Sequence, residues 1–210
     1  MEPIIKVNKL SQKIGRKMLL KEISFEVLPG ECFGVFGTRG TGKTSLLHIL
    51  AGVDRFTSGQ VEVLGSNIRK TEKFKHDLGL VTQERSLFPD LTVAENLDFI
   101  AALKKASKAD VCEMIERYEL NELLAEPVTV LDTMGVFQRL SLACAMLNSP
   151  KLLIADEIIK DIDLYSRNLI LRELQQFQAE GGTCVYAFSN IAFCGYMSKV
   201  GWNYNSGMLY

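Results

Sequence analysis

The sequence contains few of the residues that build disulfide frameworks and zinc sites. Its 210 residues include only five cysteines and two histidines, and no two cysteines form a C-x-x-C pair. Most of the cysteines lie in apolar stretches such as "LACAML" and "GTCVYAF", which is typical of small core residues in a reducing compartment. Neither histidine has a ligand-like neighbour, so the sequence argues against a zinc site.

An excess of charge and a long apolar run are also missing. Lys and Arg together number 24 and Asp and Glu 25, so no global field points to nucleic acid. No segment approaches the roughly 18 apolar residues of a membrane span, and the opening "MEPIIKVNKL" does not have the pattern of a signal peptide. We therefore expect a soluble intracellular protein that holds any anion at a local site.

The composition and the order of patterns favour one α/β domain over residues 1–210. Hydrophobic residues make up 47% of the chain and charged residues 23%, as in globular proteins. Short Val-, Ile- and Phe-rich strands are expected over residues 4–10, 23–30, 31–37 and 59–65.

Helices follow over residues 91–106, where Thr92 and Glu95 have capping-box spacing, and over 108–126. The last third alternates, with helices over 136–147 and 162–178 and buried strands over 151–156 and 183–188. This alternation predicts a mainly parallel sheet flanked by helices, with a β-rich N-terminal layer and a helical insert at about 88–135.

Residues 37–44, "GTRGTGKT", match the phosphate-binding loop pattern G-x-x-x-x-G-K-[ST]. The apolar strand "CFGVF" precedes the loop and "GKTSLLHIL" leaves it as a helix, as this motif requires. We expect its glycines to let backbone N–H groups point at phosphate oxygens, with Lys43 at the β- and γ-phosphates and Thr44 at Mg²⁺. The predicted cradle comprises Gly37, Thr38, Arg39, Gly40, Thr41, Gly42, Lys43 and Thr44.

The stretch "KLLIADEIIKDID" delivers two carboxylates at the end of an apolar run. A phosphate loop needs an acidic residue on a neighbouring strand for Mg²⁺, and Asp156 has the expected position. Glu157 follows it and is our candidate to orient or deprotonate an attacking water. The sequence thus predicts a Mg-nucleotide site with a catalytic carboxylate, and these two carboxylates are its acidic part.

Three segments together resemble the ATP-binding cassette (ABC) transporter ATPases, and the resemblance extends over essentially the whole chain. They are "ISFEVLPGECFGVFGTRGTGKTSLLHILAGVDRFTSGQVEVLG", "LGLVTQERSLFPDLTVAENL" and "QRLSLACAMLNSPKLLIADE". The resemblance implies a P-loop NTPase core and a glutamine loop in which Gln83 contacts Mg²⁺ and water. It also implies ATP and Mg²⁺ as ligands, and ATP hydrolysis that drives transport.

The same resemblance implies partners and a location. Such subunits act in pairs, either as a homodimer or with another ABC ATPase, and each ATP lies between one phosphate loop and the partner's signature motif. They pass motion to separate transmembrane permease subunits, which implies a cytoplasmic, peripheral position on the cell membrane. Nucleic acid is not an expected partner.

The chain departs from the family pattern at four places. The L-S-G-G-Q signature is degraded to "DTMGV", Asp132 to Val136, in which Thr133 stands for the serine and Gly135 alone is kept. The expected switch histidine is Ser189, which can donate a hydrogen bond but carries no charge. "IIKDID" follows Glu157 in place of the usual proline and small polar residue, and Ile14 takes the position of the adenine-stacking aromatic.

These departures leave two hypotheses open. The first is an ATP-hydrolysing transport subunit, motivated by Lys43, Asp156 and Glu157. The second is a nucleotide-binding regulatory subunit, weak or inactive in turnover and paired with an active ABC ATPase. The degraded signature and Ser189 motivate it. The signature-like segment also has a purely structural interpretation, in which Asp132 or Thr133 caps a core helix. A cassette protein of DNA repair or translation is disfavoured, because the chain lacks a basic face, a tandem second cassette and a coiled coil.

Overall fold

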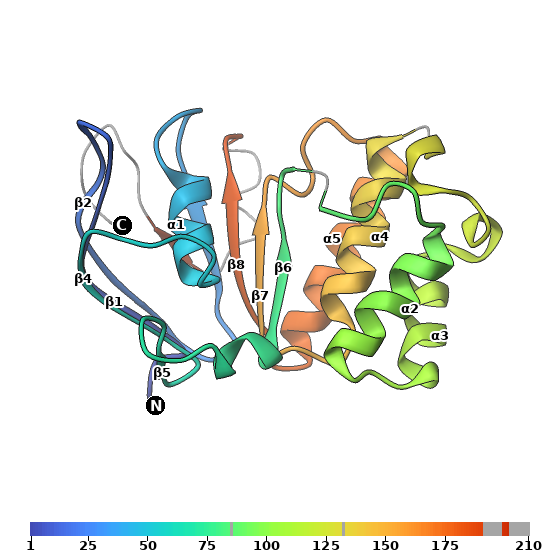
Figure 1. Ribbon diagram of the computed structural model, residues 1–210, viewed down its shortest axis with the longest axis horizontal. Coiled ribbons are helices and arrows are strands. Elements are labelled where there is room, and N and C mark those ends of the chain that lie inside the picture. The colour runs from blue at the N-terminus through green and yellow to red at the C-terminus, as the bar shows by residue number, and fades with distance from the viewer. Residues whose placement is uncertain (85, 132, 191–198, 202–210) are drawn as a thin grey trace.

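The computed structural model describes residues 1–84, 86–131, 133–190 and 199–201, and the strands in these residues form two sheets (Figure 1). The first sheet is antiparallel, in the order β2-β1-β4-β5. The second is parallel throughout, in the order β6-β7-β8-β3-β9. The strands are β1 (Ile5–Ile14), β2 (Lys17–Val27), β3 (Cys32–Phe36), β4 (Ser58–Val63), β5 (Ser66–Asn67), β6 (Leu78–Val81), β7 (Leu152–Asp156), β8 (Thr183–Phe188) and β9 (Lys199–Gly201).

Helices cover both faces of the parallel sheet, as the alternating pattern predicts. Helix α1 lies between the two sheets and packs on β7 and β8, whereas α4 and α5 lie on the other side, with α2 and α3 outside them (Figure 1). The α-helices are α1 (Lys43–Leu50), α2 (Val93–Lys104), α3 (Lys108–Arg117), α4 (Met134–Met146) and α5 (Leu164–Ala179). Short 3₁₀ helices are η1 (Lys73–Asp77), η2 (Asn121–Leu123) and η3 (Val128–Val130).

The parallel sheet separates two hydrophobic cores because successive strand side chains point to opposite faces. On β7, Leu152 and Ile154 pack with α1 and the antiparallel sheet, whereas Leu153 and Ala155 pack with the helices on the other face. Every residue of β7 and β8 is buried. This is why the sequence shows these strands as continuous apolar runs, and why the polar groups that follow them stand out.

Local signals in the sequence set several helix starts. Thr92 and Glu95 form the predicted capping box at the start of α2, and Ser107 and Asp110 form a second one at α3. Asp163 caps α5 by accepting a hydrogen bond from Ser166 N at 2.8 Å. Each cap satisfies backbone N–H groups that the first helical turn leaves without a partner.

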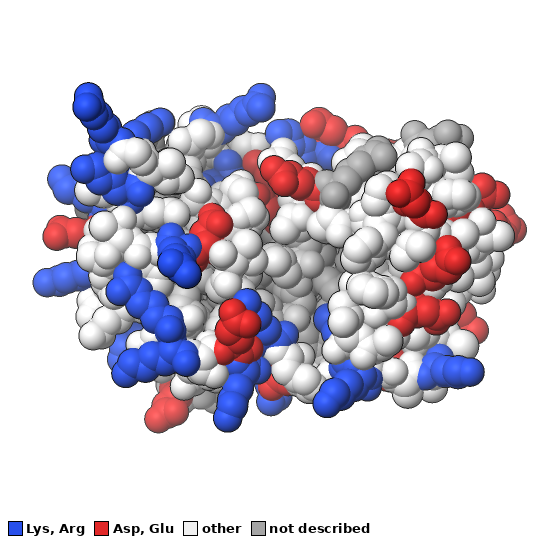
Figure 2. Space-filling model, viewed as in Figure 1, with Lys and Arg blue, Asp and Glu red and all other residues white. Residues whose placement is uncertain are grey.

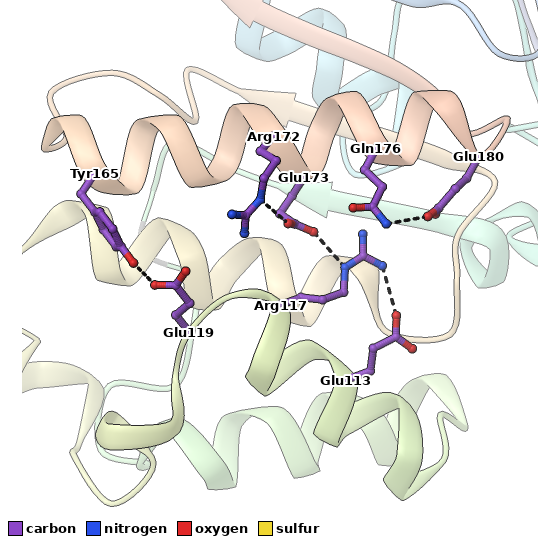
Figure 3. Close-up of polar contacts among 8 residues, drawn as sticks. All are labelled: Glu113, Arg117, Glu119, Tyr165, Arg172, Glu173, Gln176 and Glu180. Atoms are coloured by element: carbon purple, nitrogen blue, oxygen red, sulfur yellow. Dashed lines mark hydrogen bonds and ion pairs between the residues drawn. The ribbon is translucent and has the colours of Figure 1, made fainter.

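A polar cluster around the buried Glu173 carboxylate joins α3 to α5 (Figure 3). Arg117 Nε donates to Glu173 Oε2 at 2.8 Å and Arg117 Nη1 donates to Glu113 Oε1 at 3.2 Å. The Glu173 side chain is only 4% exposed and also accepts a hydrogen bond from Arg172, on the same helix. The carboxylate of Glu173 is thus buried with its charge compensated by two guanidinium groups.

Two expectations about the helices need correction. The segment 108–126 is not continuously helical, because Glu119 has a φ of 53°, and the chain continues as a turn and then η2. Within the helix expected over 162–178, the apolar residues recur at helical spacing and include Tyr165. Tyr165 is nevertheless 60% exposed, and its hydroxyl donates a hydrogen bond to Glu119 (Figure 3). The tyrosine side chain is amphipathic, and its hydroxyl requires a polar partner, which explains this placement.

The cysteine environments and the surface charge complete the picture. Cys32, Cys144 and Cys184 are buried and Cys112 is exposed, and none of these four forms a disulfide, whereas Cys194 lies outside the described residues. On the face in Figure 2, Lys and Arg are more frequent over the antiparallel sheet, and Asp and Glu over the helices on the right. In the part of the chain that the structure describes, no helix combines the length and the apolar character needed to cross a bilayer.

Candidate functional site

The predicted phosphate loop connects β3 to α1 at the carboxyl end of the parallel strands. Gly40 and Gly42 have φ values of 82° and 91°, a left-handed conformation that side chains rarely adopt. Gly42 directly precedes α1, so the loop ends at the N-terminus of that helix, which is the positive end of its dipole. Thr41 Oγ1 donates to Thr38 O at 2.9 Å and stabilises the turn from inside. The backbone is therefore arranged to surround an anion.

Lys43 lies across this loop. Its side chain is buried, and Nζ donates to Gly37 O at 2.7 Å and to Thr38 O at 3.3 Å. The same ammonium lies 3.3 Å from Glu157 Oε1 in a pair whose side chains are 7% and 9% exposed. An ammonium with carbonyls on one side and a carboxylate on the other is held at the mouth of the loop, where a phosphate would bind.

Asp156 ends β7 beside the first turn of α1. Thr44 Oγ1 donates to Asp156 Oδ2 at 2.5 Å, whereas Oδ1 is buried and has no hydrogen-bond partner in the described residues. Burial raises the pKa of Asp156 above its usual range, and the Thr44 hydrogen bond opposes this shift. A bound cation would satisfy the buried oxygen and favour the ionised form. The hydroxyl of Thr44, the carboxylate of Asp156 and the amide of Gln83 are oxygen donors that suit Mg²⁺.

Glu157 has an unusual backbone and a well-defined side chain. Its φ is 51°, and its backbone N–H continues the ladder by donating to Ala187 O at 3.0 Å. Ser189 Oγ donates to Glu157 Oε2 at 3.0 Å, so the two carboxylate oxygens face Ser189 and Lys43 respectively. This arrangement orients a carboxylate toward the mouth of the phosphate loop, the position that an attacking water requires.

A cleft of about 220 Å³ contains these groups. It is lined by Leu19, Arg39, Gly40, Gly42, Lys43, Thr44, Ser45, Gln83, Glu157, Lys160 and Ser189. A larger cavity, of about 460 Å³, opens near the start of β8 and includes none of the predicted site residues. We place the chemistry in the smaller cleft because the phosphate loop and the paired carboxylates converge there.

The structure brings most of the predicted site residues together. Arg39, Gly40, Gly42, Lys43, Thr44, Gln83, Glu157 and Ser189 line the cleft, and the remaining cradle and metal residues, Gly37, Thr38, Thr41 and Asp156, are joined to it by backbone continuity or hydrogen bonds. Segments separated by more than half of the sequence therefore converge at one sheet edge, as the motifs predict.

Three predicted ligand-binding residues neither line this cleft nor are joined to it in these ways. Ile14 is 58% exposed at the end of β1, and Leu19 of β2 lines the cleft instead. Thr133 caps α4 by accepting a hydrogen bond from Val136 N at 3.3 Å. Gly135 is buried against α5, where a Cβ would lie 2.6 Å from Ser166 Cβ. Asp132 lies outside the described residues, so its predicted part in the signature is not described.

Sequence reasoning missed Leu19, Ser45 and Lys160 as residues of the cleft. Ser45 directly follows the loop motif, so its position in the sequence could have placed it in the cleft. Leu19 lies in the ordinary strand pattern of β2, and no spacing rule distinguishes it. Lys160 follows two isoleucines, and only the turn after Glu157 brings it to the cleft.

Known proteins are similar to this chain in sequence. A family model described as "ABC transporter" matches residues 20–160. The uncharacterized ABC transporter ATP-binding protein YdbJ of Bacillus subtilis is 37% identical over 164 residues, which cover 77% of this chain and 53% of that protein. The linearmycin resistance ATP-binding protein LnrL, also from B. subtilis, is 32% identical over 188 residues, which cover 87% of this chain and 60% of that protein.

A similarity to a solved structure supports the fold. A dimeric, post-hydrolysis state of the ATP-binding cassette MJ0796, bound to ADP and Pi, superimposes with a TM-score of 0.85 at 22% identity, covering 93% of this chain and 92% of that one. By contrast, this chain spans only between half and two thirds of the length of the two curated relatives.

Proposed function

Because this chain belongs to the ABC transporter family, we propose that it is an ATP-binding subunit that binds and hydrolyses Mg-ATP to power transport through separate membrane subunits. The observation that carries the proposal is the arrangement at the mouth of the phosphate loop. Lys43, Thr44, Asp156 and Glu157 come from two segments and converge there with the partners that phosphate, metal and water require. The loop from Gly37 to Thr44 is the proposed nucleotide cradle.

The proposed metal ligands are Thr44, Gln83 and Asp156. Mg²⁺, when bound, neutralises charge on the β- and γ-phosphates. The hydroxyl of Thr44 is already adjacent to the Asp156 carboxylate, so the two oxygens are held on one side of the site before any ligand binds. Ionised Asp156 then contributes the negative charge that attracts the cation.

Glu157 is the proposed general base. Its carboxylate accepts the hydrogen bond of Ser189 and faces Lys43, which fixes its direction. Ser189 acts as the positioning group for Glu157, a role that a hydroxyl performs without charge. The carboxylate would orient a water toward the terminal phosphate and accept its proton.

The assembly is also part of the proposal. We propose that the chain acts as a dimer, with itself or with another ABC ATPase, on the cytoplasmic face of a membrane. Helices α2 and α3, in a helical subdomain at about 88–135, would transmit motion to permease subunits. Thr133 and Gly135 would contribute to the partner's nucleotide site, and Ile14 would contact the adenine.

A second candidate function is a regulatory subunit that binds nucleotide with little turnover. The Thr133 hydroxyl is the specific observation in its favour, because that oxygen already accepts the hydrogen bond of Val136 N–H in its own helix. A group used as an N-cap is less available to a partner's phosphate. In this function the chain would pair with an active ABC ATPase.

Phosphate release from Mg-ATP tests the proposal, with the purified chain beside Glu157→Gln and with nucleotide binding measured in both. We expect the parent chain to turn over ATP and the variant to lose about 100-fold or more of that rate while still binding nucleotide. Binding with no turnover in either chain would favour the regulatory function. Absence of binding would contradict both candidates.

A further inference from the structure

We propose that Lys160 is a phosphate-contacting residue that makes the cleft prefer a nucleoside triphosphate over a diphosphate. The inference rests on the proposed function, because it assigns the end of the cleft beside Glu157 to the terminal phosphate. Lys160 belongs to no motif that identifies the site. Its part follows from where the turn after β7 places it.

The turn after Glu157 directs Lys160 back toward the cleft. Lys160 N donates to Glu157 O at 2.9 Å, and Glu157 and Asp161 both have left-handed backbones, with φ of 51° and 55°. Ile158 is 4% exposed in the core, and Ile159 and Ile162 pack against the same core. The two isoleucines that replace the usual proline and small polar residue thus anchor the turn, and the lysine that follows them remains exposed.

Lys160 lies where two hollows meet. Glu157, Lys160 and Ser189 line the cleft, and the same three residues line a neighbouring hollow of about 220 Å³. Because Lys160 shares both walls with Glu157 and Ser189, it belongs to the catalytic end of the cleft. Leu19 of β2 lines the cleft but not the neighbouring hollow, so it lies away from the end where the two hollows meet. Lys160 lines both and therefore lies at that end.

A cation beside Glu157 would favour the binding of a terminal phosphate at this end of the cleft. The Lys43 ammonium is 3.3 Å from the Glu157 carboxylate, so its charge is already largely compensated. The Ser189 hydroxyl is neutral and donates its hydrogen to Glu157. A phosphate next to Glu157 would be repelled by that carboxylate, and a positive charge beside Glu157 would reduce this repulsion in addition to Mg²⁺ and the exposed Arg39 of the same cleft.

Lys160 can supply that charge. In the described residues, no hydrogen bond or ion pair engages the Lys160 ammonium, in contrast to Lys43 with its two carbonyls and one carboxylate. A lysine ammonium is a point charge on a flexible four-carbon stem, so it can move to a phosphate without a change in the backbone. An ADP-bound cleft would lack the group that this ammonium contacts.

The test compares affinity for a non-hydrolysable ATP analogue with affinity for ADP, both with Mg²⁺. For Lys160→Gln we expect about a five- to tenfold loss for the triphosphate and less than about a twofold loss for ADP. Lys160→Arg keeps the charge and should stay within about twofold of the parent for both nucleotides. Lys70→Gln removes an exposed lysine beyond β5 and is the matched control for net charge.

Each outcome decides the assignment. Selective loss of the triphosphate, with the Arg variant and the control unchanged, supports it. Unchanged binding in Lys160→Gln, or an equal loss for both nucleotides, overturns it while the proposed function stands, provided that Lys43→Ala abolishes binding. A parent chain that binds neither nucleotide overturns the proposed function and this inference together. Equal melting temperatures of parent and Lys160→Gln verify that the variant is folded.

Discussion

The phosphate cleft and the helical layer formed by α3, α4 and α5 differ in how their buried carboxylates are satisfied. In the cleft, Asp156 Oδ1 is buried without a partner in the described residues, and Gly40 and Gly42 of the phosphate loop have left-handed backbones. In the helical layer, Thr133 caps its own helix and Glu173 is buried between two guanidinium groups. A buried carboxylate oxygen without a partner beside the phosphate loop indicates where a cation belongs, whereas a carboxylate held by two guanidinium groups indicates a scaffold.

The largest effect that tests this comparison is expected from Arg117→Met. The substitution leaves the buried Glu173 with only Arg172, whose side chain is 60% exposed, while methionine retains the apolar packing. We expect the free energy of unfolding to fall by about 2–3 kcal/mol and nucleotide affinity to stay the same, as measured by urea denaturation and by titration.

Glu113→Gln is the matched control for that experiment. Glu113 is 58% exposed, so loss of its charge should change the free energy of unfolding by less than about 0.5 kcal/mol. If Arg117→Met were as mild as this control, the α3–α5 cluster would not be the scaffold that the comparison assigns.

Two glycine substitutions test the same comparison, with expected changes in the free energy of unfolding of intermediate size. A Cβ on Gly135 would collide with the Asp163 carboxylate and with Ser166, so Gly135→Ala should lower the free energy of unfolding by about 2 kcal/mol. A Cβ on Gly40 meets open space but is strained at a φ of 82°, at a cost of about 1 kcal/mol.

The two variants should differ in what they disturb. We expect Gly135→Ala to lower the melting temperature without weakening nucleotide binding by the isolated chain, and Gly40→Ala to weaken binding more than it lowers the melting temperature. The reverse pattern would contradict the division into scaffold and ligand site.

The smallest expected effect is a pH dependence at the far end of α4. Lys104 Nζ donates to Ala145 O at 2.5 Å and to Leu147 O at 3.3 Å, and burial lowers the pKa of Lys104 from 10.5 to about 8. The unfolded chain therefore binds more protons than the folded one between these two values, so the stability contributed at this site rises with pH.

A comparison of the parent with Lys104→Met checks this sign. From about pH 7 to about pH 9 the free energy of unfolding of the parent should gain about 1 kcal/mol relative to the variant, in which the group is absent. An equal slope in both chains would show that Lys104 does not titrate with a lowered pKa.

The sequence was sufficient for the sheet that carries the site and for most of the cleft. Buried parallel strands appear as apolar runs because both faces are covered, and the loop at 37–44 is recognisable because anion binding restricts its glycines and lysine. The side chains of Asp156 and Glu157 could be predicted for the same reason, since a carboxylate at the end of a buried strand has few structural uses.

The sequence was insufficient where a side chain's position depends on tertiary packing. Leu19 reaches the cleft because β2 lies against the phosphate loop, and Lys160 reaches it because Ile158 is buried. The end of α3 at Arg117 depends on the left-handed backbone of Glu119, which is not a residue that favours it. The structural interpretation of Thr133 as a cap was available from the sequence, but only the geometry shows its hydrogen bond.

The position of β3 within the parallel sheet also affects how the chain folds. This strand, which leads into the phosphate loop, pairs with β8 and β9. Its partners are distant in the sequence, since Cys32 pairs with Cys184 and Phe33 with Lys199. Pairings between such distant segments incur a large loop-closure entropy and form slowly. During synthesis the β3 strand leaves the ribosome well before residues 183–188 and 199–201, which form its two neighbours. The nucleotide site is therefore expected to be among the last parts of the molecule to assemble.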